Sequence, residues 1–177
     1  MEATAATSDF VQAAVRDFEA LKTRDAAGMA ASYAEDAIAD IVPVGVLRGS
    51  NEIREFFEGV FAAFPDLETT YDIVATSVNI VVIEWRSRGT FTGAPFQDLE
   101  PNGKSVEYRG VDVMRIEDDR IVHNTAYYDG MTVARQLGML PPGGIVTRLM
   151  PNDSRPSERR TRDQSPLRSQ SLRWTLV

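Results

Sequence analysis

The chain has 177 residues, a net charge of −7 and 43% hydrophobic residues, which fits one domain with a core and an extra segment. It contains no Cys and a single His, His123, which excludes disulfides, thiolate chemistry and metal sites that need two imidazoles. No apolar run approaches the roughly 18 residues of a membrane span, and the N-terminal residues lack the parts of a secretory signal, so we expect a cytoplasmic protein without membrane contact.

The charge is unevenly distributed along the chain. Residues 148–177 hold seven Arg and three acidic residues, so residues 1–147 carry a net charge of −11. An acidic domain does not suit nucleic-acid binding, which calls for a basic face. The basic C-terminal segment is poor in apolar residues, as disordered chain is, although such a tail can also bind an acidic partner. We predict a flexible N-terminus at residues 1–7, one folded domain at 8–147 and a disordered basic tail at 148–177.

The first half of the chain has helical periodicity. Apolar residues recur at helical spacing through residues 9–22, and Asp25 can cap a second short helix that carries Met29 and Tyr33 and ends at residues 35–36. Residues 37–42 predict a short strand. A third helix starts at Gly49 and is stopped by Pro65.

In the second half of the chain, apolar and polar residues alternate with period two, which predicts strands at residues 67–76, 79–92, 104–117 and 120–128. A last helical turn is predicted at residues 131–137. Helices followed by antiparallel strands indicate an α+β fold. We expect a cone-shaped, curved antiparallel sheet with three N-terminal helices packed on its concave face.

One acid stands out in the 104–117 strand. Asp112 shares a face with Tyr108, Gly110 and Met114 because side chains alternate along a strand. A carboxylate in an apolar wall is costly, so its pKa should rise, and a neutral carboxylic acid can donate a hydrogen bond to an oxyanion. The alternative is an Asp112 that pairs with an Arg or lies at a wet sheet edge.

Three helices cannot fully cover a long curved sheet, so a pocket should remain between the two layers. Polar groups that converge in an apolar cleft are the usual form of a small-molecule site, whereas an aromatic stripe alone is usually core. The expected wall consists of Trp85, Phe91, Tyr108, Asp112, Met114, Asn124, Ala126 and Tyr128 from strands and Tyr33, Phe57 and Phe61 from helices.

The opposite face of the sheet mixes apolar residues with both signs of charge. This composition suits a partly buried interface, so we expect a homodimer through Val111, Val113, Arg86, Arg88, Glu107 and Arg109.

Six short segments resemble the SnoaL-like polyketide ester cyclases, and the resemblance covers roughly residues 8–142. They are residues 33–37 (YAEDA), 49–57 (GSNEIREFF), 64–67 (FPDL), 89–93 (GTFTG), 101–104 (PNGK) and 135–138 (RQLG). The resemblance implies the nuclear-transport-factor-two-like cone fold, which ketosteroid isomerases, small dehydratases and limonene epoxide hydrolases share. It does not by itself imply one activity.

The resemblance carries over unevenly at the level of residues. The acid/base Asp of the cyclases falls on Ala126. The ketosteroid isomerase pattern instead fits Asp112 as a neutral oxyanion donor and puts the general base at Asp40. The turn from Tyr33 to Asp40 is one residue shorter than in the isomerases, and the position of their second oxyanion donor, a Tyr, falls on Asp17 or Phe18.

The sequence therefore predicts a cofactor-free, metal-free enzyme that acts on a hydrophobic carbonyl compound, polyketide- or steroid-like, as a cyclase, isomerase or lyase. Asp40 would move the proton and Asp112 would hold the enolate. The substrate-binding residues would be Tyr33, Phe57, Trp85, Phe91, Tyr108, Met114, Asn124 and Tyr128. One alternative is a non-catalytic module that binds a ligand or a subunit, which Ala126 favours. The third possibility, epoxide hydrolysis, needs an inward-facing Arg that the predicted wall does not offer.

Overall fold

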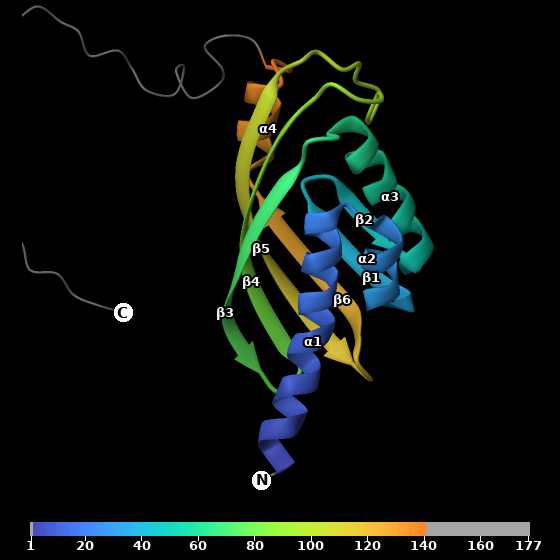
Figure 1. Cartoon of the computed structure of the whole chain (residues 1–177), viewed down its shortest axis with the longest axis vertical. Helices are drawn as coiled ribbons and strands as arrows, with labels where there is room; N and C mark the ends of the chain where they lie inside the picture. The colour runs from blue at the N-terminus through green and yellow to red at the C-terminus, as the bar shows by residue number, and fades with distance from the viewer. Residues whose placement is uncertain (1, 141–177) are drawn as a thin grey trace, which may run out of the picture. The chain divides into compact units, whose positions relative to one another are not determined.

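The computed structural model describes residues 2–140, and side chains from residue 10 onward (Figure 1). The predicted basic tail, residues 148–177, lies outside the described residues. The elements follow in the order α1 (Glu2–Thr23), α2 (Ala26–Ser32), β1 (Tyr33–Val42), β2 (Gly45–Arg48), α3 (Gly49–Ala63), β3 (Glu68–Ser77), β4 (Ile80–Thr90), β5 (Ser105–Glu117), β6 (Arg120–Tyr128) and α4 (Gly130–Gln136).

The six strands form one curved, unclosed sheet in the order β2-β1-β6-β5-β4-β3. Neighbouring strands are antiparallel except for β1 and β6, which run parallel, so the sheet is mixed rather than purely antiparallel. The parallel pair arises because the chain leaves β1 through β2 and α3 and returns to it only after the three-hairpin run β3 to β6. The α+β class and the curved sheet are confirmed.

The three N-terminal helices lie on one side of the sheet (Figure 1). α1 crosses β3, β4, β5 and β6, whereas α3 packs on β1 and β2. Short-range caps fix where the smaller helices begin. The Asp25 side chain accepts a hydrogen bond from Gly28 N at 2.9 Å at the start of α2, and Asp129 accepts from Thr132 N at 3.0 Å at the start of α4.

Two boundaries differ from the sequence-based expectation. α1 begins at Glu2, so it extends into the segment for which we predicted flexible chain. The prediction that Tyr33 belongs to the second helix is wrong. Tyr33 has extended backbone dihedral angles and pairs with Ile121 of β6, so it opens β1 instead. Tertiary strand pairing has overridden the helical spacing of Met29 and Tyr33.

The buried side chains form two clusters. The first joins α1, α3 and the sheet centre around Phe18, Ile53, Ile83 and Met114. The second joins the end of α3 to the residue after β4, to β5 and to the residue after α4, and includes Phe64, Phe91, Val106 and Leu137. Each cluster buries several large apolar side chains, each of which contributes about 1.5–3 kcal/mol to stability. The space between the clusters is where the structure leaves room for a ligand.

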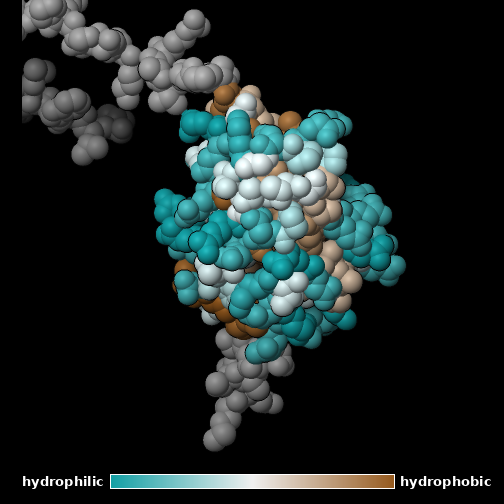
Figure 2. Space-filling model, turned by 45° about the horizontal axis from the view of Figure 1, so that its top comes forward, coloured by the Kyte–Doolittle hydropathy of each residue, from teal (hydrophilic) through white to brown (hydrophobic). Residues whose placement is uncertain are grey.

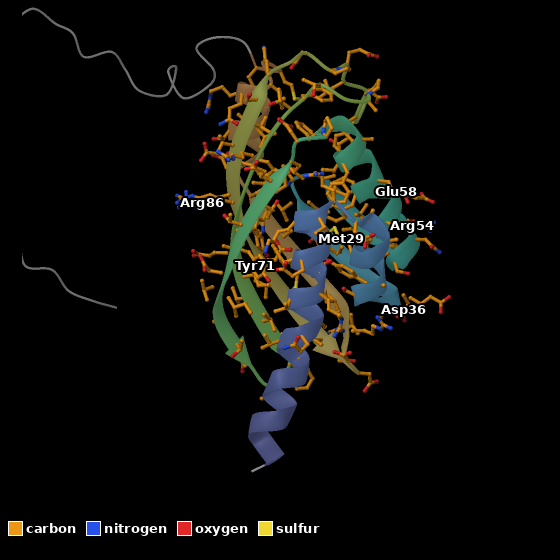
Figure 3. The ribbon with its side chains drawn as sticks, viewed as in Figure 1. Met29, Asp36, Arg54, Glu58, Tyr71 and Arg86 are labelled. Atoms are coloured by element: carbon orange, nitrogen blue, oxygen red, sulfur yellow. The ribbon has the colours of Figure 1, made fainter. Side chains whose placement is uncertain are left out.

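On the face that Figure 2 displays, the surface is mainly hydrophilic, with smaller apolar areas between the hydrophilic ones. Arg86 projects from the side of the sheet away from α1, and Arg54 and Glu58 point outward from α3 (Figure 3). None of the described helices combines the length and the apolar character that crossing a membrane requires.

Gly110 should tolerate no side chain, because the Trp85 ring covers it. A Cβ at Gly110 would overlap that ring and lie 2.5 Å from the carbonyl oxygen of Tyr127. We expect Gly110→Ala to lower the free energy of unfolding by about 1–3 kcal/mol, as overpacking does, measured by urea denaturation. Gly59→Ala is the control, since its new Cβ would meet only the flexible Phe96 side chain at 3.2 Å. Equal effects of the two substitutions would contradict this prediction.

Candidate active site

A cavity of about 480 Å³ lies between the helices and the sheet. Its wall draws on α1, α2, α3, β1, the inner faces of β4, β5 and β6, and α4, and it includes members of both core clusters. Most of the wall is apolar, and a few polar side chains converge at one place, which is the usual form of a small-molecule site. These polar residues are Asp17, Tyr33, Trp85, Asp112 and Asn124.

Asp112 lies at the centre of this polar group, on the inward face of β5. Its side chain is 7% exposed. The Trp85 Nε1 group donates a hydrogen bond to Oδ1 at 2.6 Å, and Asn124 Nδ2 donates to Oδ2 at 2.7 Å. Such short bonds are typical of an ionised acceptor. Both carboxyl oxygens accept, so the geometry favours the carboxylate form of Asp112.

Burial and these hydrogen bonds shift the pKa of the Asp112 carboxyl group in opposite directions. Burial raises the pKa of the carboxyl group, and the hydrogen bonds from Asn124 and Trp85 lower it, with a result of about 6. A group with this pKa exchanges its proton near neutral pH, as a general acid or base must. The prediction of a raised pKa agrees with this result, whereas the role of a permanently neutral donor does not suit a carboxyl group that accepts at both oxygens.

The polar group continues from Asp112 to α1. Asn124 Nδ2 also donates to the Tyr33 hydroxyl at 3.2 Å, and hydrogen bonding with Tyr33 lowers the pKa of Asp17. Two larger effects raise that pKa well above its ordinary value, namely burial first and the nearby Asp112 charge second. Burial likewise raises the pKa of Tyr33 well above 10, with Asp17 and Asp112 adding to it. Two carboxyl groups, with Tyr33 and Asn124 beside them, therefore line one cavity.

Aromatic rings form the wall next to Asp112. The Trp85 ring meets Tyr108 edge-on at 5.5 Å between centroids, and Tyr108 lies 5.5 Å from Tyr128. Phe64 and Phe91 stack at 5.2 Å in the same cavity wall. Aromatic rings offer large apolar area with defined orientation. The arrangement suits a flat, apolar ligand.

The structure brings together most of the sequence-predicted site. The cavity-lining residues among them are Tyr33, Phe57, Trp85, Phe91, Tyr108, Asp112, Asn124, Ala126 and Tyr128. Met114 and Phe61 are not among the lining residues. Met114 faces inward but is fully covered in the first core cluster, because helix α1 packs over that part of the sheet.

Asp40 does not lie in the cavity. Its neighbours Ala39 and Ile41 line the wall, so strand alternation puts the half-buried Asp40 on the other face of β1. The structure does not bring Asp40 together with Asp112, so it does not support Asp40 as a base in this cavity. β1 is irregular just before this point, because its register against β6 shifts between Tyr33 and Ile38.

Asp17 is the site residue that the sequence reasoning did not select. It is 2% exposed and lines the cavity from α1. A signal was present, because Phe10, Ala14, Asp17 and Leu21 follow the i, i+4, i+7, i+11 spacing of one helix face. An acid on an apolar stripe is informative in a helix, as it is in a strand.

The described residues contain no group of three or more His, Asp or Glu side chains placed to hold a metal ion. The polar group of the cavity offers two carboxyls, an amide, a phenol and an indole N–H, which suit hydrogen bonding and proton transfer to an organic ligand.

The curved sheet, with helices on its inner side and a cavity between the two layers, can be compared with known protein families. The family model of the SnoaL-like polyketide cyclases matches residues 12–137. The chain therefore belongs to the SnoaL-like polyketide cyclase family.

Solved structures show the same fold. AclR from Streptomyces galilaeus, named as a candidate hydroxylase, is 21% identical with a TM-score of 0.65 over 76% of this chain and 99% of that chain. IdmH from Streptomyces antibioticus, named as a candidate polyketide cyclase, is 26% identical with a TM-score of 0.60 over 73% and 98%. An NTF2-like protein from Burkholderia pseudomallei is 22% identical with a TM-score of 0.62 over 73% and 97%. A search of curated protein sequences gave no match.

Asp112 should make stability depend on pH. Its pKa of about 6 in the folded chain exceeds the ordinary 3.8, so between about pH 4 and 6 the folded state keeps a proton that the unfolded state has lost. This contribution to the free energy of unfolding is therefore present below pH 4, falls as pH rises to 6 and is then constant, a loss on the order of 3 kcal/mol. Asp112→Asn should gain stability relative to wild type over that interval.

Urea denaturation at pH 4, 5, 6 and 7 measures the difference between the two proteins. Asp40→Asn, an equivalent change outside the cavity, controls for the loss of one charge. A difference between wild type and Asp112→Asn that stays constant with pH would contradict the prediction.

Proposed function

We propose that the protein is a cofactor-free enzyme that moves a proton on a hydrophobic carbonyl compound, polyketide- or steroid-like, with Asp112 as the general base and acid. The carrying observation is a buried carboxyl group with a pKa of about 6, held at both oxygens and facing an apolar cavity. Proton transfer by such a group contributes about 10²–10⁴-fold to a rate.

The position of Asp112 relative to Ala126 supports this proposal. The resemblance to the ester cyclases puts their acid/base at Ala126, and Ala126 is the direct cross-strand partner of Asp112. Directly opposed side chains have Cβ atoms about 4.5–5.5 Å apart. The missing carboxyl of β6 is thus replaced by one on the neighbouring strand β5 that faces the same cavity. Asp112 takes over the role that we had expected of Asp40.

The reaction begins when the Asp112 carboxylate removes a proton from the carbon beside a carbonyl group. The C–H electron pair enters the enolate, and the proton forms an O–H bond on Asp112. The enolate carbon then attacks a second carbonyl, or is reprotonated elsewhere, and Asp112 returns its proton to the product. Ring closure and isomerisation therefore need the same groups. The aromatic wall, with Trp85, Tyr108 and Tyr128, orients the substrate.

Deuterium uptake tests this chemistry without knowledge of the natural substrate. Wild type should catalyse exchange at the carbon beside the carbonyl of 1-tetralone or of a 3-keto steroid in D₂O, followed by NMR. Asp112→Asn should lower the rate by about 10²–10⁴-fold with ligand-induced shifts in melting temperature retained. Asp40→Asn is the matched control and should exchange like wild type.

A second variant tests the cross-strand replacement. Adding Ala126→Asp to Asp112→Ala should restore part of the exchange rate, since the new carboxyl faces the same cavity. A wild type that is stabilised by these ligands but catalyses no exchange would support the binding-module alternative and contradict the enzyme.

We also propose a homodimer through the outer face of the sheet. Arg86 lies directly opposite Arg109, whereas Arg88 lies opposite Glu107, and Val111 and Val113 are only half-buried in the single chain. Directly opposed like charges are destabilising, so a carboxylate of a second copy near Arg86 and Arg109 would be favourable.

The dimer is tested by light scattering at high micromolar concentration. Wild type should have the mass of two chains, and Val113→Asp should shift it to one chain by placing a charge in the interface. Arg54→Asp on the outward side of α3 (Figure 3) is the control and should leave the mass unchanged. A monomeric wild type would contradict the proposal.

A further inference from the structure

Asp17 is a second buried carboxyl group of the cavity, and the proposed reaction of Asp112 does not use it. It comes from α1, on the opposite side of the cavity wall from the strand that carries Asp112. It is 2% exposed, and its Oδ1 atom has no hydrogen-bond partner among the described residues. A buried carboxylate oxygen without a hydrogen bond raises the free energy of the folded state. The structure must therefore favour the protonated form of Asp17 or a partner that a bound ligand supplies.

The two carboxyl groups of the cavity differ in what surrounds them. Asp112 has a hydrogen-bond donor at each oxygen. Asp17 has the Tyr33 hydroxyl as its stabilising contact, and that hydroxyl also accepts from Asn124. Among the described residues, no cation forms an ion pair with either carboxyl group. When two acids share one site, the better-solvated or better-hydrogen-bonded one ionises first and opposes ionisation of the other.

We infer that Asp17 is the second catalytic acid of the site, a neutral carboxyl group that donates a hydrogen bond to the carbonyl oxygen of the bound ligand while Asp112 takes the proton from the neighbouring carbon. The O–H of Asp17 then stabilises the oxyanion of the enolate and keeps its own proton throughout. This role toward a ligand rests on the proposed function, whereas the protonation order of the two acids does not.

The electrostatic relation between the two acids supports this assignment. The Asp112 charge raises the pKa of Asp17, beyond what burial alone does, whereas burial and the hydrogen bonds from Asn124 and Trp85 set the pKa of Asp112. Asp112 therefore ionises first, and Asp17 remains the proton-bearing partner. A neutral donor opposite a nearby carboxylate is the pairing that enolate formation requires.

The protonation order is measured by NMR titration of ¹³C-labelled Asp side chains in the full chain without ligand. Asp112→Asn and Asp17→Asn identify the two signals. We expect Asp112 to titrate near 6 and Asp17 to release its proton at higher pH. Removing the Asp112 charge by Asp112→Asn should lower the midpoint of Asp17, whereas Asp17→Asn should leave the midpoint of Asp112 nearly unchanged. An Asp17 that ionises before Asp112 would overturn the inference and leave the proposed role of Asp112 intact.

The donor role is measured with 1-tetralone labelled with ¹³C at its carbonyl. In wild type the infrared carbonyl band of the bound ketone should shift to lower frequency than in water-free solvent. The shift should persist in Asp17→Asn, which keeps a donor of similar shape, and disappear in Asp17→Leu, with deuterium exchange reduced by about 10–10³-fold. Asp40→Leu is the control outside the cavity. An unchanged band in Asp17→Leu would overturn the donor role. If Asp17→Leu does not fold, the NMR titration of wild type and the two Asn variants still tests the protonation order.

Discussion

The hydrogen bonds from Trp85 and Asn124 to Asp112 are the interaction on which the site depends. A carboxylate in an apolar wall would ordinarily take up a proton or pair with a cation, and here an indole N–H and an amide N–H hold it instead. The three residues come from β4, β5 and β6, the strands at the middle of the sheet. Their geometry is therefore fixed by strand register rather than by a loop, and sites built on strands hold their side chains more precisely than sites built on loops.

The same register makes room for the Trp85 ring. Gly110 is the cross-strand partner of Trp85, and the absence of a side chain there lets the indole lie flat against β5 and reach Asp112 two residues further along. The aromatic wall then continues through Tyr108 and Tyr128. One small residue in the sheet thus determines both the hydrogen bond to the carboxyl group and the shape of the cavity beside it.

Period-two alternation predicted the strands and the inward direction of Asp112, Trp85 and Asn124, because all three lie in long, regular strands. Two predictions fail for different reasons. Tyr33 is the first residue of β1, where pairing with Ile121 of β6, far away in sequence, outweighed the local helical spacing. Asp40 lies inside β1 between the cavity-lining residues Ala39 and Ile41, and its assignment as a base came from the resemblance rather than from strand alternation. Asp17 was missed for a different reason, since it required the apolar helix face to be checked for an acid in the same way as the strand. Met114 shares the correct face but lies below α1, and sequence alternation cannot distinguish cavity wall from covered core.

The charge of the cavity wall has a consequence for which molecules can enter. Among its described lining residues, the side chains that can carry charge are two acids and several phenols, and no Lys, Arg or His is present. A ligand that brought its own carboxylate would meet a site of the same sign in surroundings of low dielectric, where like charges repel strongly. A neutral ligand would meet no such barrier. Under the proposed function, a wall of this kind would disfavour free acids by repulsion, a form of specificity that requires no dedicated recognition contact.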